Sequence, residues 1–224
     1  MEQPDLVVTP LLRLGFLTIT STVVTTWVIM AIVAGFAWGV TRRLKIEPGP
    51  VQTAVEGAVT AIEAAIAEVA PREARILLPF IGTLWIFLTV ANLVGVIPEM
   101  HSPTRDLSAT SALAVLVFFS THWFGIRAEG VRGYLKHYLT PSPLMLPFHL
   151  ISEVTRTVAL AVRLFGNMMS LEMAALLILL VAGFLVPIPL LMLHIVEALV
   201  QAYIFGTLAL IYISGGIQSQ QSKE

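Results

Sequence analysis

The amino-acid sequence predicts an all-α polytopic membrane protein, with five membrane helices and one amphipathic helix on the cytoplasmic side. The chain is 57% hydrophobic and only 12% charged, which a soluble domain of this length would not be. Five runs without Asp, Glu, Lys or Arg reach the roughly 20 residues that a bilayer-spanning helix needs. They cover residues 14–41, 76–98, 107–126, 173–196 and 198–222. The absence of cysteine excludes disulfides and thiolate metal sites, and a net charge of −1 gives no indication of nucleic acid.

The first membrane helix is expected over residues 14–40, because its apolar run is too long for a signal-peptide core. The sequence Pro48-Gly49-Pro50 then breaks the chain. Residues 51–70 have an apolar stripe with glutamates on the opposite side, which is typical of a helix lying along a surface. This segment has no Lys or Arg, so anionic lipids would repel it, and we expect it to pack on its own bundle or on a partner subunit.

Two further membrane helices are expected over residues 76–97 and 107–126. If each helix crosses the membrane once, most positive residues fall on one side of it. These are Arg42, Arg43, Lys45, Arg72, Arg75, Arg127, Arg132 and Lys136. The other side holds only Arg13 and Arg105. Because positive residues gather in the cytoplasm, the N-terminus is predicted outside, and the surface helix and the C-terminus are predicted inside.

The last two membrane helices are expected over residues 147–186 and 190–214, as a long tilted hairpin. The first of them runs for about 40 residues without an internal proline. A helix of that length spans roughly 60 Å, whereas the hydrocarbon core is about 30 Å thick. We therefore expect a steep tilt, because Gly166 and Gly183 are its only weak points. The whole chain, residues 1–224, is expected to form a single membrane domain.

Polar side chains are concentrated in the first helix of this hairpin. Steps of three, four and seven residues place them on one face, and the set is Glu153, Arg156, Arg163, Asn167 and Ser170. Glu172 lies nine residues beyond Arg163 and points to the opposite side. An arginine at the centre of a membrane helix costs roughly 2.5–3.5 kcal/mol, and such residues usually face a bundle interior or a water-filled cavity and mark ion paths.

The last helix has its own polar stripe, formed by His194, Glu197 and Gln201. A metal site from Glu172, His194 and Glu197 is disfavoured because the spacing typical of zinc ligands is missing. A hydrolase is disfavoured because neither a GxSxG nor an HExxH motif occurs. We therefore expect no metal, cofactor or catalytic residue. Carboxylates and a histidine suit a proton relay, whereas the guanidinium of Arg163 does not deprotonate and would be a fixed positive barrier.

Three segments together are similar to a known family. The run Arg163-Leu164-Phe165-Gly166-Asn167-Met168 with Glu172 beyond it, the segment from His194 to Phe205 with Glu197 and Gln201, and the preceding Pro147-Phe148-His149 resemble subunit a of F-type ATP synthases. The resemblance covers the whole chain in helix order. Leu171 departs from it, because a small residue commonly precedes the glutamate, and its bulk puts the width of the outer channel in doubt.

This resemblance implies a non-catalytic stator subunit that faces a rotating ring of c subunits. Ions would reach a ring carboxylate by one half-channel and leave by a second, with Arg163 separating the two and Gln201 opposite it. Glu172, His194 and Glu197 would belong to the outer half-channel, and Glu153 and Arg156 to the cytoplasmic end. The implied partners are the c-ring, b-type peripheral stalk subunits and the rest of the complex. The implied location is a bacterial inner or plasma membrane.

Several alternatives stay open at this point. The coupling ion is expected to be H⁺, with Na⁺ as the alternative, and a self-contained ion-coupled transporter is a second candidate function. Glu153 and Arg156 could simply pair with each other, since they are three residues apart. His194 could be a structural donor instead of a relay, and Asn167 could serve packing instead of the channel.

Overall fold

A computed structural model describes residues 10–14, 17–42, 44–97, 100–139, 146–182 and 187–221, and this part of the chain is almost entirely helical. The helices are α1 (Ser21–Thr41), α2 (Pro50–Val69), α3 (Ala74–Val94), α4 (Leu107–Leu139), α5 (Leu146–Ala182) and α6 (Pro187–Gln221). A 3₁₀ turn, η1 (Pro103–Arg105), precedes α4. Every α-helix except α2 is long and apolar enough to cross a membrane. The predicted class, a polytopic all-α membrane protein, is confirmed.

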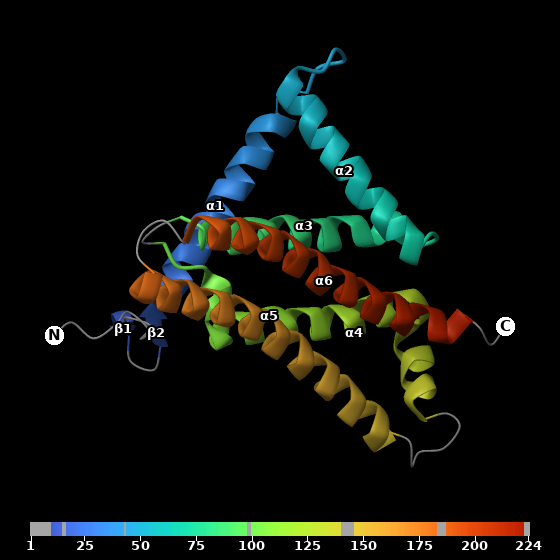
Figure 1. Cartoon of the computed structure of the whole chain (residues 1–224). Coiled ribbons are helices and arrows are strands. Elements are labelled where there is room, and N and C mark those ends of the chain that lie inside the picture. The colour runs from blue at the N-terminus through green and yellow to red at the C-terminus, as the bar shows by residue number, and fades with distance from the viewer. Residues whose placement is uncertain are drawn as a thin grey trace.

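Helices α3, α4, α5 and α6 form the bundle, with α5 and α6 running antiparallel to each other (Figure 1). The core consists mainly of apolar side chains from these four helices, including Leu77 and Ile81 of α3, Leu164 and Met168 of α5, and Phe205 of α6. Helices α1 and α2 lead away from the bundle and back to it, like two sides of a triangle (Figure 1). Ile29 is the one buried residue of α1, so this helix contributes little to the core.

Helix α6 approaches α3 closely at Gly206. A β-carbon added at Gly206 would clash with the indole of Trp85, so only glycine fits at this position. The indole Nε1 of Trp85 donates a hydrogen bond to the Tyr203 carbonyl at 3.2 Å, and the two rings stack with their centroids 5.7 Å apart. Helix α6 is thereby fixed on α3.

The predicted start of the first helix is wrong. Residues 17–20 and Leu14, expected within a helix over 14–40, lie in a short antiparallel hairpin of β1 (Pro10–Leu14) and β2 (Leu17–Thr20). The helix begins only at Ser21. The β-branched residues Thr18, Ile19 and Thr20 favour an extended backbone over a helical one. The sequence predicted only that the run is apolar, and apolar character does not distinguish a strand from the first turns of a helix.

Two other helices are longer than predicted. Helix α4 continues beyond residue 126 to Leu139 with a kink at Gly130, where φ is 77°, a backbone conformation that favours glycine. Helix α6 extends from Pro187 to Gln221 instead of over residues 190–214. Proline is tolerated in a first helical turn, where its missing N–H would have no partner. The helix continues through Gly215 and Gly216 because Ile213 and Ile217, on either side of them, are buried in the bundle.

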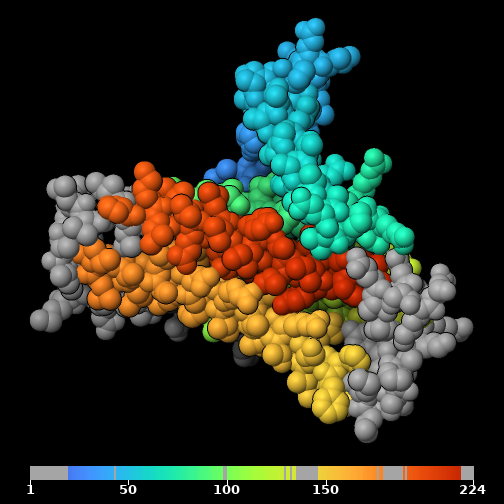
Figure 2. All heavy atoms as spheres, turned by 45° about the vertical axis from the view of Figure 1, so that its right-hand side comes forward, coloured from blue at the N-terminus to red at the C-terminus, as the bar shows by residue number. Residues whose placement is uncertain are grey.

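Helix α2 packs partly on its own bundle. Its C-terminal half contacts α3, with Ile66 fully buried and Ile62 packed against Gly82. Its N-terminal half projects from the bundle (Figure 2), and Val51 and Val59 are exposed there. The prediction that α2 packs on protein is therefore confirmed for its C-terminal half.

Helix α5 remains continuous through Gly166, one of its two predicted weak points, while Gly183 lies outside the described residues. Its 37 residues correspond to about 55 Å of helix. This is well above the roughly 30 Å of a hydrocarbon core. The steep tilt of the hairpin stays a prediction that this length supports.

Candidate functional site

Arg163 lies near the middle of α5. Leu160 and Leu164, which precede and follow it along the helix, are buried in the core. Its own side chain is exposed on the outside of the bundle. Within the described part of the chain it makes no hydrogen bond or ion pair. Helices α5 and α6 also expose large apolar or aromatic side chains, namely those of Val158, Val162, Leu199 and Tyr203. A permanent cation thus stands within an apolar membrane helix with no internal partner among these residues.

Asn167 and Gln201 join α5 to α6 one turn beyond Arg163. The amide nitrogen of Asn167 donates to Oε1 of Gln201 at 2.5 Å. Gln201 is only 1% exposed, and its own Nε2 has no hydrogen-bond partner among the described residues. A buried donor without a partner is costly, at about 1–3 kcal/mol. Gln201 was expected opposite Arg163; among the described residues its side chain bonds instead to Asn167, four residues further along α5.

Glu172 binds to a part of the chain that the sequence analysis left out of the site. Its Oε1 accepts from Nη1 of Arg105 at 2.7 Å, and lies 2.8 Å from Nδ1 of His101. Both partners come from the connection between α3 and α4. Glu172 was expected on the side of α5 opposite to Arg163. Its two partners, His101 and Arg105, come from a different part of the chain than Arg163.

His194 lies within electrostatic range of Glu172. The negative charges of Glu172 and Glu197 both act on its ring, and the ring is almost fully buried. Glu197 is half-buried on the same helix. The predicted grouping of Glu172, His194 and Glu197 thus corresponds to a common electrostatic neighbourhood at one end of the bundle.

A buried hydrogen-bond network fixes the connection that carries His101 and Arg105. Asn92 of α3 donates to the Ala198 carbonyl of α6 at 3.1 Å and accepts from Thr104 at 2.7 Å. Oγ of Ser102 lies 2.9 Å from the Ala91 carbonyl and 2.6 Å from the Thr104 hydroxyl, and it can donate its one hydrogen to either of them. All three network side chains, those of Asn92, Ser102 and Thr104, are at most 4% exposed. Since buried polar groups are costly unless paired, this network defines the position of η1.

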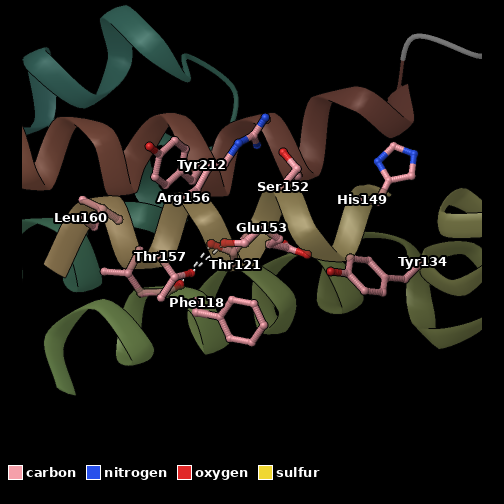
Figure 3. Close-up of a pocket in the computed structure, with 13 residues that line it drawn as sticks. Phe118, Thr121, Tyr134, His149, Ser152, Glu153, Arg156, Thr157, Leu160 and Tyr212 are labelled. Atoms are coloured by element: carbon pink, nitrogen blue, oxygen red, sulfur yellow. Dashed lines mark hydrogen bonds between the residues drawn. The ribbon is translucent and has the colours of Figure 1, made fainter. Parts of the chain in front are cut away.

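At the other end of the bundle, a cavity of about 350 Å³ lies between α4, α5 and α6. Figure 3 shows Glu153, Arg156 and His149 among its lining residues, with Tyr212 of α6 beside Arg156. The guanidinium carbon of Arg156 lies 5.6 Å from the centre of the Tyr212 ring, close enough for a cation–π contact. Among the described residues, no ion pair joins Arg156 to Glu153, so the simple pairing of these two residues is not observed.

Glu153 has a partner from α4 instead. Its Oε2 lies 3.5 Å from Nε2 of His122, while Nδ1 of the same ring lies 2.8 Å from the Phe118 carbonyl. A carbonyl only accepts, so Nδ1 carries a hydrogen. A neutral ring would then present a lone pair at Nε2 to Glu153. The contact is therefore attractive only when a further proton resides on His122 or Glu153.

Three residues of these contacts were not predicted as site residues: Arg105, His101 and His122. Arg105 contributed only to the predicted orientation, His101 lies in the short connection between two predicted helices, and His122 is an isolated histidine in an apolar run. No spacing rule joins them to Glu172 or Glu153, because the contacts cross between separate helices. The one available signal was that each is a titratable or charged residue near the end of a predicted membrane helix.

Comparison with known proteins gives consistent matches over nearly the whole chain. The family model described as ATP synthase A chain matches residues 23–214. ATP synthase subunit a 2 of Pelobacter propionicus is 64% identical over 213 residues, covering 95% of this chain and 93% of that protein. ATP synthase subunit a 1 of Hahella chejuensis is 65% identical over 215 residues, covering 96% and 92%. ATP synthase subunit a of Legionella pneumophila is 57% identical over 211 residues, covering 94% and 92%.

These matches extend across all the helices that carry the polar residues described above. A family model that covers most of the chain, and relatives at this identity over almost their full length, show the family. The rest of the ATP synthase is therefore its partner, and a bacterial membrane is its location. The chain belongs to the subunit a family of F-type ATP synthases, as a multi-pass stator subunit of the membrane-embedded Fo sector.

Proposed function

We propose that the chain provides two half-channels for protons to a ring of c subunits, and that Arg163 separates them. The observation that carries this proposal is the side chain of Arg163, which is exposed on the outside of the bundle without an internal partner among the described residues. A cation in this position is costly in lipid. A carboxylate of a neighbouring ring would compensate for that cost each time it passed.

The surroundings of Arg163 support a ring as this neighbour. On α5 and α6, the side chains of Val158, Val162, Leu199 and Tyr203 are between 45% and 55% exposed, and they are apolar or aromatic. An apolar face can slide past an apolar ring surface without breaking directional bonds. The c-ring is therefore the proposed partner at α5 and α6. The exposed N-terminal half of α2 is the proposed contact surface for a b-type peripheral stalk subunit.

Polar groups lie at both ends of the bundle, which supports two separate paths. Glu172, His194 and Glu197 form the proposed outer path, and the cavity lined by Glu153 and Arg156 forms the proposed cytoplasmic path. Between them lie Arg163 and the bonded pair of Asn167 and Gln201. The proposed orientation, with the N-terminus outside and the C-terminus in the cytoplasm, assigns the cavity to the cytoplasmic side.

The energetics suit this arrangement. A carboxylate about 4 Å from Arg163 gains roughly 4 kcal/mol at an effective dielectric constant of 20. This favours the ionised ring carboxylate while its proton is exchanged. One charge that crosses 100 mV yields only about 2.3 kcal/mol. Many proton transfers must therefore be summed by rotation before one ATP is made.

ATP-driven transport by the complete complex in sealed vesicles tests the choice of ion. With H⁺ as the coupling ion, ATP acidifies the vesicle interior without Na⁺, and a protonophore abolishes the acidification. If transport requires Na⁺ and a protonophore accelerates it, the Na⁺-coupled alternative replaces this proposal. Transport by the chain alone, without a c-ring, would instead favour the self-contained transporter.

A further inference from the structure

We infer that the connection between α3 and α4 forms the outer mouth of the ion path, with Arg105 as a positioning residue for Glu172 and His101 as the group that delivers protons to it. This inference rests on the proposed proton path through Glu172. It concerns residues that lie outside the polar stripes of α5 and α6.

The first support is a gradient of exposure across neighbouring groups. The side chain of His101 is 45% exposed, that of Glu172 is 20% exposed, and His194 beyond it is 6% exposed. His101 and Glu172 are in direct contact, and the charge of Glu172 acts on His194. Titratable groups therefore lead from the surface into the bundle, and His101 is the outermost of them.

The second support is how Glu172 is held. Arg105 and His101 both bind its Oε1, at 2.7 and 2.8 Å, while Oε2 has no hydrogen-bond partner among the described residues. A guanidinium does not release its proton, so Arg105 cannot pass protons to Glu172. It can only hold one oxygen in place and thereby leave the other available to the groups further inside.

The third support is the buried hydrogen bonding that anchors residues 102–104 next to Arg105. Thr104 lies next to Arg105 and bonds to Asn92, which in turn bonds to the carbonyl of Ala198 on α6. Ala198 directly follows Glu197 along α6. The network therefore places Arg105 at a defined distance from the outer group on α6. A loop that served only to connect two helices would need no such buried anchor.

The proposed transfer is a simple proton relay. A proton from external water binds to Nε2 of His101, which has no hydrogen-bond partner among the described residues, and the proton on Nδ1 passes to Oε1 of Glu172. The ring is left neutral with its proton on Nε2, and exchange with water restores the starting tautomer. The described charged groups near His101 are Glu172 and Arg105, while Asp106 bonds to Ser108 at the start of α4. Glu99 lies outside the described residues.

ATP synthesis by the complete complex in vesicles tests this inference, with the pH on the outer side varied at constant membrane potential. His101→Ala should raise the proton concentration for half-maximal rate about ten-fold, and added imidazole should restore it. Arg105→Gln should lower this concentration instead, because a Glu172 carboxylate without its guanidinium partner is protonated more easily, and added imidazole should have no effect. Arg105→Lys, which keeps the positive charge, should bring the half-maximal proton concentration part of the way back to the wild-type value. Arg75→Gln, an exposed arginine at the start of α3, is the matched control and should match the wild type.

An unchanged half-maximal concentration in His101→Ala and Arg105→Gln would overturn the inference, and so would a lower maximal rate at an unchanged half-maximal concentration. Arg163→Ala in the same assay separates this failure from that of the proposed function. If Arg163→Ala abolishes synthesis while the two mouth variants match the wild type, only the mouth is wrong. If Arg163→Ala is fully active, the proposed half-channels are wrong as well.

Discussion

Asn167 of α5 donates a hydrogen bond to Gln201 of α6 across 2.5 Å, one helical turn beyond Arg163. This bond fixes how the two helices are rotated relative to each other at the centre of the site. Because Gln201 is buried and Arg163 is exposed, the pair also holds the arginine on the outer face of the bundle. The rotation of α5 thus depends on a side-chain contact as well as on the apolar core.

The first prediction concerns this contact. Gln201→Met should destabilise the purified complex by about 1–3 kcal/mol, because it leaves the Asn167 amide without its acceptor. The double variant Asn167→Leu with Gln201→Met should recover most of that loss, since both polar groups are then absent. Thermal unfolding in detergent measures the stability of the wild type, the two single variants and the double variant. Additive losses in the double variant would show that the two side chains do not depend on each other.

Gly206 gives a prediction about packing. Gly206→Ala should destabilise the complex by about 1–3 kcal/mol, because the added methyl group clashes with the Trp85 indole. Trp85→Leu should relieve the clash, so the double variant should be more stable than the sum of the single changes predicts. Gly35→Ala, where nothing lies within 4 Å, is the control and should cause no loss. Equal effects at Gly206 and Gly35 would contradict this account of the contact between α3 and α6.

The kink in α4 gives a third prediction. Gly130 has φ 77° and ψ 162°, and a residue with a β-carbon in that region is strained by about 1–3 kcal/mol. The kink brings Tyr134 back onto Gly125, with its ring 5.9 Å from that of His122. Gly130→Ala should therefore lower the melting temperature and speed proteolysis after α4. Cleavage at the wild-type rate would show that α4 tolerates an ordinary residue there.

Glu153 gives a prediction about the cytoplasmic cavity. Glu153→Gln should leave assembly intact, because an amide can donate to Nε2 of His122 and fill the same volume. Passive proton flow through vesicles containing Fo alone should nevertheless fall several-fold, since general acid–base groups commonly contribute far more than that to proton transfer. Ser152→Ala, at an exposed neighbour that also lines the cavity, is the control. Normal proton flow in Glu153→Gln would remove this carboxylate from the path.

Much of this architecture could be predicted because membrane helices need long apolar runs and their polar faces follow a fixed period. The stripes of Arg163 with Asn167 on one helix, and of His194 with Gln201 on the other, follow from local spacing. The partners of Glu172 do not, because Arg105 and His101 lie 67 and 71 residues away. Only the tertiary fold brings them together. The short N-terminal hairpin was missed for a different reason, since hydropathy alone does not distinguish strand from helix.

The most direct test of the proposed half-channels is ATP-driven ion transport by the reconstituted complex, wild type against Arg163→Ala. Assembly is checked by the amount of complex recovered, and Arg75→Gln controls for the loss of an arginine. The account predicts that Arg163→Ala assembles but loses coupled transport, and that Arg163→Lys also largely fails. Transport at the wild-type rate in Arg163→Ala would show that this arginine is structural, and the proposed separation of two half-channels would have to be abandoned.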